Sequence, residues 1–179
     1  MDARVRDLLT TLRTAESVEP QWSVIDEWVA GRELARLREA AFSLAEPTSP
    51  GWAVSSVLDY LIRRLALTPC AEFAGVVRDL ARRRDAPYLA SLVATGQSPE
   101  VMASLVEDGE FGACLTQELA LRSGGVEREP FLSLWKRLWR RGHPLAWLPL
   151  RLTAIEEGVA LPWYSERGSG FAPGPRREC

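Results

Sequence analysis

Apolar residues recur at helical spacing along most of this chain, and this periodicity is the feature that most constrains its fold. Val5, Leu8, Leu9 and Leu12 follow the i, i+3, i+4, i+7 pattern, which places them on one face of a helix. Comparable stripes recur as far as residue 164, whereas the alternating pattern typical of strands is almost absent. The sequence therefore predicts a fold of amphipathic helices, because each helix must bury its apolar face against another.

Prolines stand near the starts of several predicted helices at nearly regular positions. Proline suits the first turn of a helix, because the N–H that it lacks would have no partner there. The five positions are separated by 30, 19, 30 and 31 residues: Pro20, Pro50, Pro69, Pro99 and Pro130. This spacing predicts a repeated helix–turn–helix unit of roughly thirty residues, and so an all-α, irregular stack of antiparallel helix hairpins. Such a chain resembles the α-solenoids built from HEAT or TPR repeats, with about nine to ten helices.

Several residues are expected to mark helix ends. Thr68 is predicted to cap the helix that follows residue 67, and Asp85 to cap a short helix that ends near residue 94. Gly96 is expected to close that short helix in the left-handed conformation, and Gly109 to stop the next one. On the helix 52–67, Trp52 is expected to face inward with the leucines.

The length of 179 residues suits one domain. Residues 1–164 are predicted to form a single helical-repeat domain. Residues 165–179 are rich in Gly, Pro, Ser and Arg, a composition typical of a flexible tail.

Charge is unevenly distributed along the chain. The formal net charge is −2, but residues 91–125 carry one basic and five acidic residues, a net of −4, and residues 126–179 carry nine basic and six acidic residues, a net of +3. This asymmetry favours a charged protein partner or self-association. The run Arg82, Arg83 and Arg84 is explained without any ligand, because cations at the end of a helix oppose its dipole.

Cysteine usage and hydropathy bear on the compartment. Cys70, Cys114 and Cys179 are odd in number and contain no CxxC pair, which favours reduced thiols and predicts a cytoplasmic protein. No run of eighteen apolar residues occurs, so no membrane span is predicted.

The stretch from Glu129 to Tyr164 holds four of the seven tryptophans and the only histidine. Its first helix, 130–141, combines an apolar stripe with a cluster of basic residues. This cluster is interpreted either as a solvated face at a helix end or as a patch that binds acidic or phosphate groups, with Trp139 available for stacking. The candidate binding residues are Lys136, Arg137, Trp139, Arg140, Arg141, His143 and Trp147.

His143 lies in the turn Gly142-His143-Pro144, where capping or packing is its simplest role. As a catalyst it would need a carboxylate, and Glu156 and Glu157 are the nearest in sequence. No second histidine is available for a metal, and neither a phosphate-binding loop nor a nucleophile elbow occurs. We therefore expect no catalytic residues, metal, cofactor or small-molecule ligand.

The segment 142–170, GHPLAWLPLRLTAIEEG…LPWYSERGSG, resembles the closing segment of an uncharacterised family of helical proteins from high-GC bacteria. The resemblance implies a helical fold and brings no activity with it. The positions that it implies are shared are Gly142, His143, Pro144, Trp147, Pro149, Glu156 and Tyr164.

The sequence thus favours a non-catalytic helical-repeat protein that mediates protein–protein interaction. Two alternatives stay open. One is a nucleic-acid-binding protein that uses the basic helix 130–141, and the other is an enzyme with a site formed by His143 and a glutamate.

Overall fold

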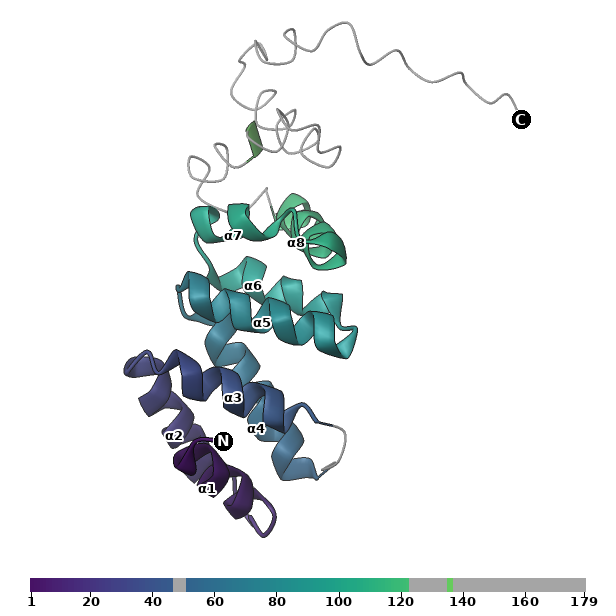
Figure 1. The fold of residues 1–179 in the computed structure, drawn as a ribbon. Coiled ribbons are helices and arrows are strands. Elements are labelled where there is room, and N and C mark those ends of the chain that lie inside the picture. The colour runs from purple at the N-terminus through teal and green to yellow at the C-terminus, as the bar shows by residue number, and fades with distance from the viewer. Residues whose placement is uncertain (47–50, 123–134, 137–179) are drawn as a thin grey trace, which may run out of the picture. The chain divides into compact units, whose positions relative to one another are not determined.

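In the computed structural model, which describes residues 1–46, 51–122 and 135–136, every regular element is a helix (Figure 1). The all-α prediction is therefore confirmed for this part of the chain. The α-solenoid subtype stays a prediction, and the helices described differ in length from 7 to 16 residues. The elements are α1 (Ala3–Leu12), α2 (Glu19–Ala30), α3 (Leu34–Leu44), α4 (Trp52–Leu67), α5 (Ala71–Arg84), the 3-10 helix η1 (Pro87–Leu89), α6 (Ala90–Gly96), α7 (Pro99–Leu105) and α8 (Gly109–Arg122).

The chain divides into two units, residues 1–122 and 123–179. The first unit contains all the helices named above. Of the second, only Trp135 and Lys136 are described, so the predicted boundary between residues 164 and 165 lies outside the described residues.

Several helix starts follow directly from local sequence. Asp2 caps α1, and its carboxylate accepts a hydrogen bond of 2.8 Å from the backbone N–H of Arg4. Ser98 caps α7 in the same way, with Pro99 at the first helical position. Pro20 occupies the first turn of α2, as its sequence predicts.

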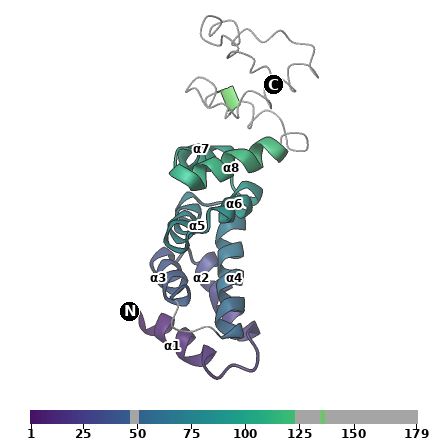
Figure 2. The same ribbon diagram turned by 90° about the vertical axis from the view of Figure 1, so that its right-hand side faces the viewer.

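The longest helix, α4, is the centre of the first unit. It packs against α1, α2, α3, α5 and α6. In Figure 2, α3 and α5 are seen nearly end-on, whereas α4 is seen from the side and runs vertically, so α4 crosses both of them. Val57, Leu61 and Leu65 of α4 are fully buried, which is why one helix can join so many others through apolar contact.

Two residues close the junction between α4, α5 and α6. Gln97 is buried, and its side-chain amide donates to the carbonyl oxygens of Ala66 and Thr68 at 2.7 and 2.8 Å. Its amide oxygen accepts from the backbone N–H of Cys70 at 3.0 Å. Gly96 lies so near α4 that an added Cβ would come within 2.3 Å of the Leu67 Cα atom. The end of α6 is therefore fitted to the backbone of the α4–α5 turn.

Ion pairs join α3, α5 and the turn between α7 and α8. Asp79 pairs with Arg38 of α3 at 2.9 Å and with its neighbour Arg78 at 2.8 Å. Arg78 also lies 3.3 Å from the carboxylate of Asp108, which pairs with Arg82 as well. The Asp108 side chain is only 10% exposed, and one of the five acidic residues of 91–125 is thus neutralised within the chain.

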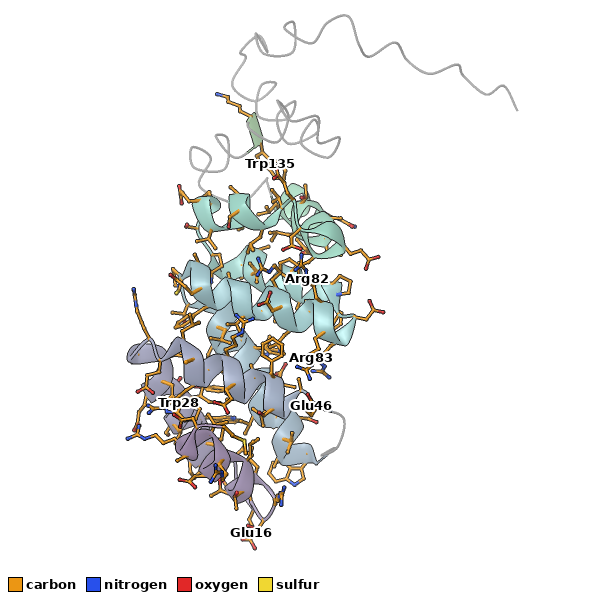
Figure 3. The ribbon with its side chains drawn as sticks, viewed as in Figure 1. Glu16, Trp28, Glu46, Arg82, Arg83 and Trp135 are labelled. Carbon is orange, nitrogen blue, oxygen red and sulfur yellow. The ribbon has the colours of Figure 1, made fainter. Side chains whose placement is uncertain are left out.

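An aromatic ring and a further ion pair extend these contacts along α3 and α5. The guanidinium groups of Arg38 and Arg83 lie 5.6 and 5.3 Å from the centroid of the Phe42 ring. Arg83 also pairs with Glu46, which lies close below it in Figure 3. Two helices that cross α4 are thus tied to each other on their outer side.

Trp52 was expected to face inward, and this prediction is wrong. Its side chain is 62% exposed, and it is the first residue of α4. Seven residues separate it from Asp59 and eleven from Arg63, and these spacings place all three on one helix face. The position of Trp52 in the helical repeat, rather than its apolar character, decides its orientation.

The predicted roles of four residues at helix ends also change. Thr68 ends α4, and Cys70 precedes α5, because proline at position 69 favours extended backbone in the residue before it. Asp85 closes α5 in the left-handed conformation, with φ of 51°, instead of opening a helix. Gly96 lies within α6 and has no positive φ, whereas Gly109, with φ of 51°, opens α8 rather than stopping α7.

No helix in the described part of the chain is long and apolar enough to cross a membrane. This agrees with the absence of a long apolar run in the sequence.

Candidate functional site

The binding residues predicted from sequence lie almost entirely outside the described residues. Only Lys136 is described, and its side chain is half-buried. The binding role of the other residues stays a prediction, and these residues are Arg137, Trp139, Arg140, Arg141, His143 and Trp147.

The first unit offers a different surface, a groove bounded by α4, the end of α5, η1 and α6. We call it the α4–α6 groove, and its volume is about 350 Å³. The buried side chains Leu58, Ile62 and Leu89 contribute apolar surface to it. Its other lining residues are Ser55, Asp59, Arg63, Arg84, Tyr88, Ser91 and Leu92. A groove with an apolar wall and polar edges is typical of surfaces that receive a side chain from another molecule.

Charge in the groove is only partly compensated. Asp59 and Arg63, one turn apart on α4, form an ion pair of 2.8 Å. The guanidinium group of Arg84, by contrast, makes no ion pair or hydrogen bond with any residue in the described part of the chain. The groove therefore presents one uncompensated positive charge beside an apolar wall.

Two of the elements that form this groove, α4 and η1, carry exposed aromatic or aliphatic side chains. Among the described residues, the large apolar side chains that are exposed are Met1, Trp52, Leu67 and Tyr88. Tyr88 lines the groove itself and is 68% exposed. Trp52 and Leu67 stand at the two ends of the outward face of α4, which we call the α4 face and define as Trp52, Ser55, Asp59, Arg63 and Leu67. Three of these four side chains thus belong to α4 or η1, and Tyr88 is the one that lines the groove.

A polar cluster holds α2 against the adjacent side of α4. The Tyr60 hydroxyl donates to Asp26 at 2.8 Å, and the Arg64 guanidinium donates to the same carboxylate at 2.6 Å. The ring of Trp22 stacks on that of Tyr60 with centroids 5.0 Å apart. Burial of the phenol, together with its bond to Asp26, raises the pKa of Tyr60 above its ordinary value. The polar groups of Tyr60, Asp26 and Arg64 are thus bound to one another, and the cluster fixes the position of α4 against α2. The buried indole N–H of Trp22 has no hydrogen-bond partner among the described residues.

Two carboxyl groups elsewhere in the described residues have a lowered pKa because of structural partners. The Cys70 thiol donates to Glu72 at 3.0 Å, and this bond lowers the pKa of the Glu72 carboxyl. Arg36 accompanies Asp2 at 3.1 Å and likewise lowers the pKa of that carboxyl. Across residues 1–46, 51–122 and 135–136, no three His, Cys, Asp or Glu side chains come together as a metal site would require.

Comparison with known protein families shows the family to which the chain belongs. A model of the family of unknown function DUF6183 matches residues 19–178. The chain belongs to DUF6183. No curated protein and no solved structure matches it.

The match to DUF6183 includes every residue that lines the α4–α6 groove, since these lie between residues 55 and 92. It leaves out α1, which ends at Leu12. The groove is thus built entirely from the part of the chain that belongs to DUF6183.

Sequence reasoning missed the groove because its residues come from four separate elements. One indication was available, since Trp52 is in register with two charged residues of α4 and so had to be exposed. The lack of a partner for Arg84 could not be found in this way, because its neighbours Arg82 and Arg83 have the same residue type and the same helix-end position.

Proposed function

We propose that this member of DUF6183 binds a protein partner through the α4 face and the α4–α6 groove. The observation that carries the proposal is the groove with an apolar wall, which the exposed Tyr88 lines and one side of which is α4, the helix that carries the exposed Trp52 and Leu67. Exposed apolar surface that is bordered by polar residues is typical of interaction sites and binding grooves. The role is that of a non-catalytic binding protein.

The residue types in this surface favour protein over nucleic acid. Tyr, Trp and Arg are the residues that most often contribute large shares of binding energy at protein interfaces. Binding to nucleic acid depends instead on several cations that neutralise phosphates. In the groove, the charge of Arg63 is already balanced by Asp59, which leaves Arg84 alone.

Site-specific photo-crosslinking tests this proposal. A photoreactive phenylalanine analogue replaces Tyr88, whose side chain is largely exposed. A matched protein carries the analogue at Thr10, an exposed position on α1. The Tyr88 protein is expected to form a discrete crosslinked product in cells of its own source, and the Thr10 protein is not.

A second substitution decides whether the product reflects this surface. Adding Trp52→Ser to the Tyr88 protein should reduce the yield of the product about 5-fold or more, because an exposed aromatic anchor contributes over 1 kcal/mol at many interfaces. The crosslinked protein is then identified and the binding repeated with purified components. Equal yields of crosslinked product from the Tyr88 and Thr10 positions, or a yield that Trp52→Ser leaves unchanged, would contradict the proposal.

The crosslinked protein also distinguishes a foreign partner from a second copy of this chain. A product with twice the mass of the chain would make self-association the function of this surface. Nucleic-acid binding by the helix 130–141 and catalysis at His143 concern residues outside this surface, and they stay separate predictions.

A further inference from the structure

We infer that the segment received by the α4–α6 groove is acidic, with an Asp or Glu side chain placed next to an apolar anchor, and that Arg84 binds the carboxylate. This inference rests on the proposed function and specifies the chemistry of the partner. It is carried by the charges of the groove and by the different surroundings of three consecutive arginines.

The three arginines that end α5 differ in whether a carboxylate pairs with them. Arg82 pairs with Asp108, and Arg83 pairs with Glu46 (Figure 3). Arg84 lines the α4–α6 groove, where no carboxylate of the described residues reaches it. A cation at a helix end is explained by the helix dipole, but the dipole does not explain why only this one is left without a carboxylate.

The other charged groups near the groove do not compensate Arg84. Asp59 is held by Arg63 at 2.8 Å, one turn along α4. Asp85, the next residue in the chain, lines a different pocket with Pro87, Asp108 and Phe111. The groove therefore has a net charge of about +1 by formal count, which disfavours a basic segment and favours an acidic one.

The apolar wall fixes where the carboxylate of the partner must lie. Leu58, Ile62 and Leu89 are buried and line the same groove as Arg84 and Tyr88. An apolar side chain inserted against this wall would leave the neighbouring residues of its own segment at the polar edge. A carboxylate there can form a bidentate pair with the guanidinium group, for which arginine is better suited than lysine.

The experiment starts from a library of random peptides displayed on phage and selected on the immobilised full-length protein. Peptides that also bind the variant Trp52→Ser/Tyr88→Ser are discarded, so that the remaining ones report on this surface. We expect them to be enriched in Asp or Glu beside Leu, Ile or Phe. The best peptide is then synthesised with a fluorophore, and its Kd is measured by anisotropy.

Three variants test the role of Arg84. Arg84→Glu should weaken binding about 10-fold or more, because it replaces attraction by repulsion, whereas Arg84→Lys should stay within about 3-fold. Arg13→Glu is the matched control, since Arg13 is also exposed at the end of a helix, and it should leave the Kd unchanged. A peptide with Lys in place of its acidic residue should bind Arg84→Glu better than it binds the natural protein.

The outcomes separate this inference from the proposed function. Peptides whose binding depends on Trp52 and Tyr88 but is unchanged by Arg84→Glu, or that are rich in Lys and Arg, would overturn the acidic partner. They would not contradict the docking surface. Selection of no peptide that depends on Trp52 and Tyr88 would count against the surface itself. Tighter binding of the Lys peptide by Arg84→Glu than by the natural protein is the result that a merely structural role of Arg84 would not produce.

Discussion

At the scale of single residues, Gln97 shows how much of this fold depends on one buried amide. The carbonyl groups of Ala66 and Thr68 lie at the end of α4, where no further helical N–H is available to them. The side chain of Gln97 donates to both at 2.7 and 2.8 Å and accepts from Cys70 at the start of α5. One side chain thus satisfies backbone groups that the chain reversal would otherwise leave buried without partners.

Replacing Gln97 by leucine should lower the free energy of unfolding by about 3 kcal/mol, because the backbone partners lose their hydrogen bonds in a buried site. Urea denaturation followed by circular dichroism measures the change. The same substitution at Gln117, which is exposed on α8, is the control and should alter stability by no more than about 0.5 kcal/mol. Equal effects at both positions would show that the amide contacts of Gln97 contribute nothing.

Residue type alone could not reveal this role. Nothing in the sequence around Gln97 distinguishes it from Gln117, because the partners of Gln97 lie 27 to 31 residues earlier in the chain. Trp52 is the opposite case, since it was wrongly predicted to face inward although its register with Asp59 and Arg63, which agrees with its exposure, is visible in the sequence. Local register is thus readable from a single sequence, and contacts across the fold are not.

At the scale of helices, two glycines show why the same residue type has different consequences. Gly96 ends α6 against α4, where an added Cβ would meet the Leu67 Cα at 2.3 Å and the Ala66 carbonyl oxygen at 2.6 Å. Gly75 lies within α5, and nothing stands within 4 Å of the position of its Cβ. The first glycine allows two helices to approach closely, whereas the second only weakens the helix that contains it.

Substitution by alanine should therefore have opposite signs at the two positions. Gly96→Ala should destabilise the protein by about 1–3 kcal/mol, because backbone atoms rather than a flexible side chain oppose the new methyl group. Gly75→Ala should stabilise it by about 0.5–1 kcal/mol through better helix propensity. Thermal and urea unfolding of both variants measure these changes, and a loss of the same size at each position would contradict the close approach of α6 to α4.

Helix boundaries were predicted best where one local rule acted alone. The bounds of α4, Trp52–Leu67, agree with the periodicity of its leucines, and Ser98 and Pro99 open α7 as expected. The roles of Asp85, Gly96 and Gly109 were predicted less well, because capping rules allowed more than one assignment for each of them. Packing of α6 against α4 and α8 decided between them.

At the scale of the whole molecule, residues 1–122 form a unit with its own apolar core. Fully buried side chains within it come from all the helices from α1 to α8 and include Val5, Trp28, Leu37, Leu65, Phe73, Val93, Met102 and Leu115. A chain of this length buries over 60% of the surface that it exposes when unfolded, which is enough for many domains to fold alone. The polar contacts of Gln97 and the ion pairs of Asp79 and Asp108 also lie within this unit.

A fragment of residues 1–122 should accordingly fold without the rest of the chain. We expect a helical circular dichroism spectrum and a single urea transition. The transition followed by circular dichroism should coincide with that followed by tryptophan fluorescence, since Trp28 is buried in the core of this unit. Gln97→Leu should lower the stability of the fragment by about 3 kcal/mol, as in the full chain, because all of its partners are retained. A fragment without a cooperative transition, or one in which Gln97→Leu has no effect, would show that this unit depends on residues 123–179 for its fold.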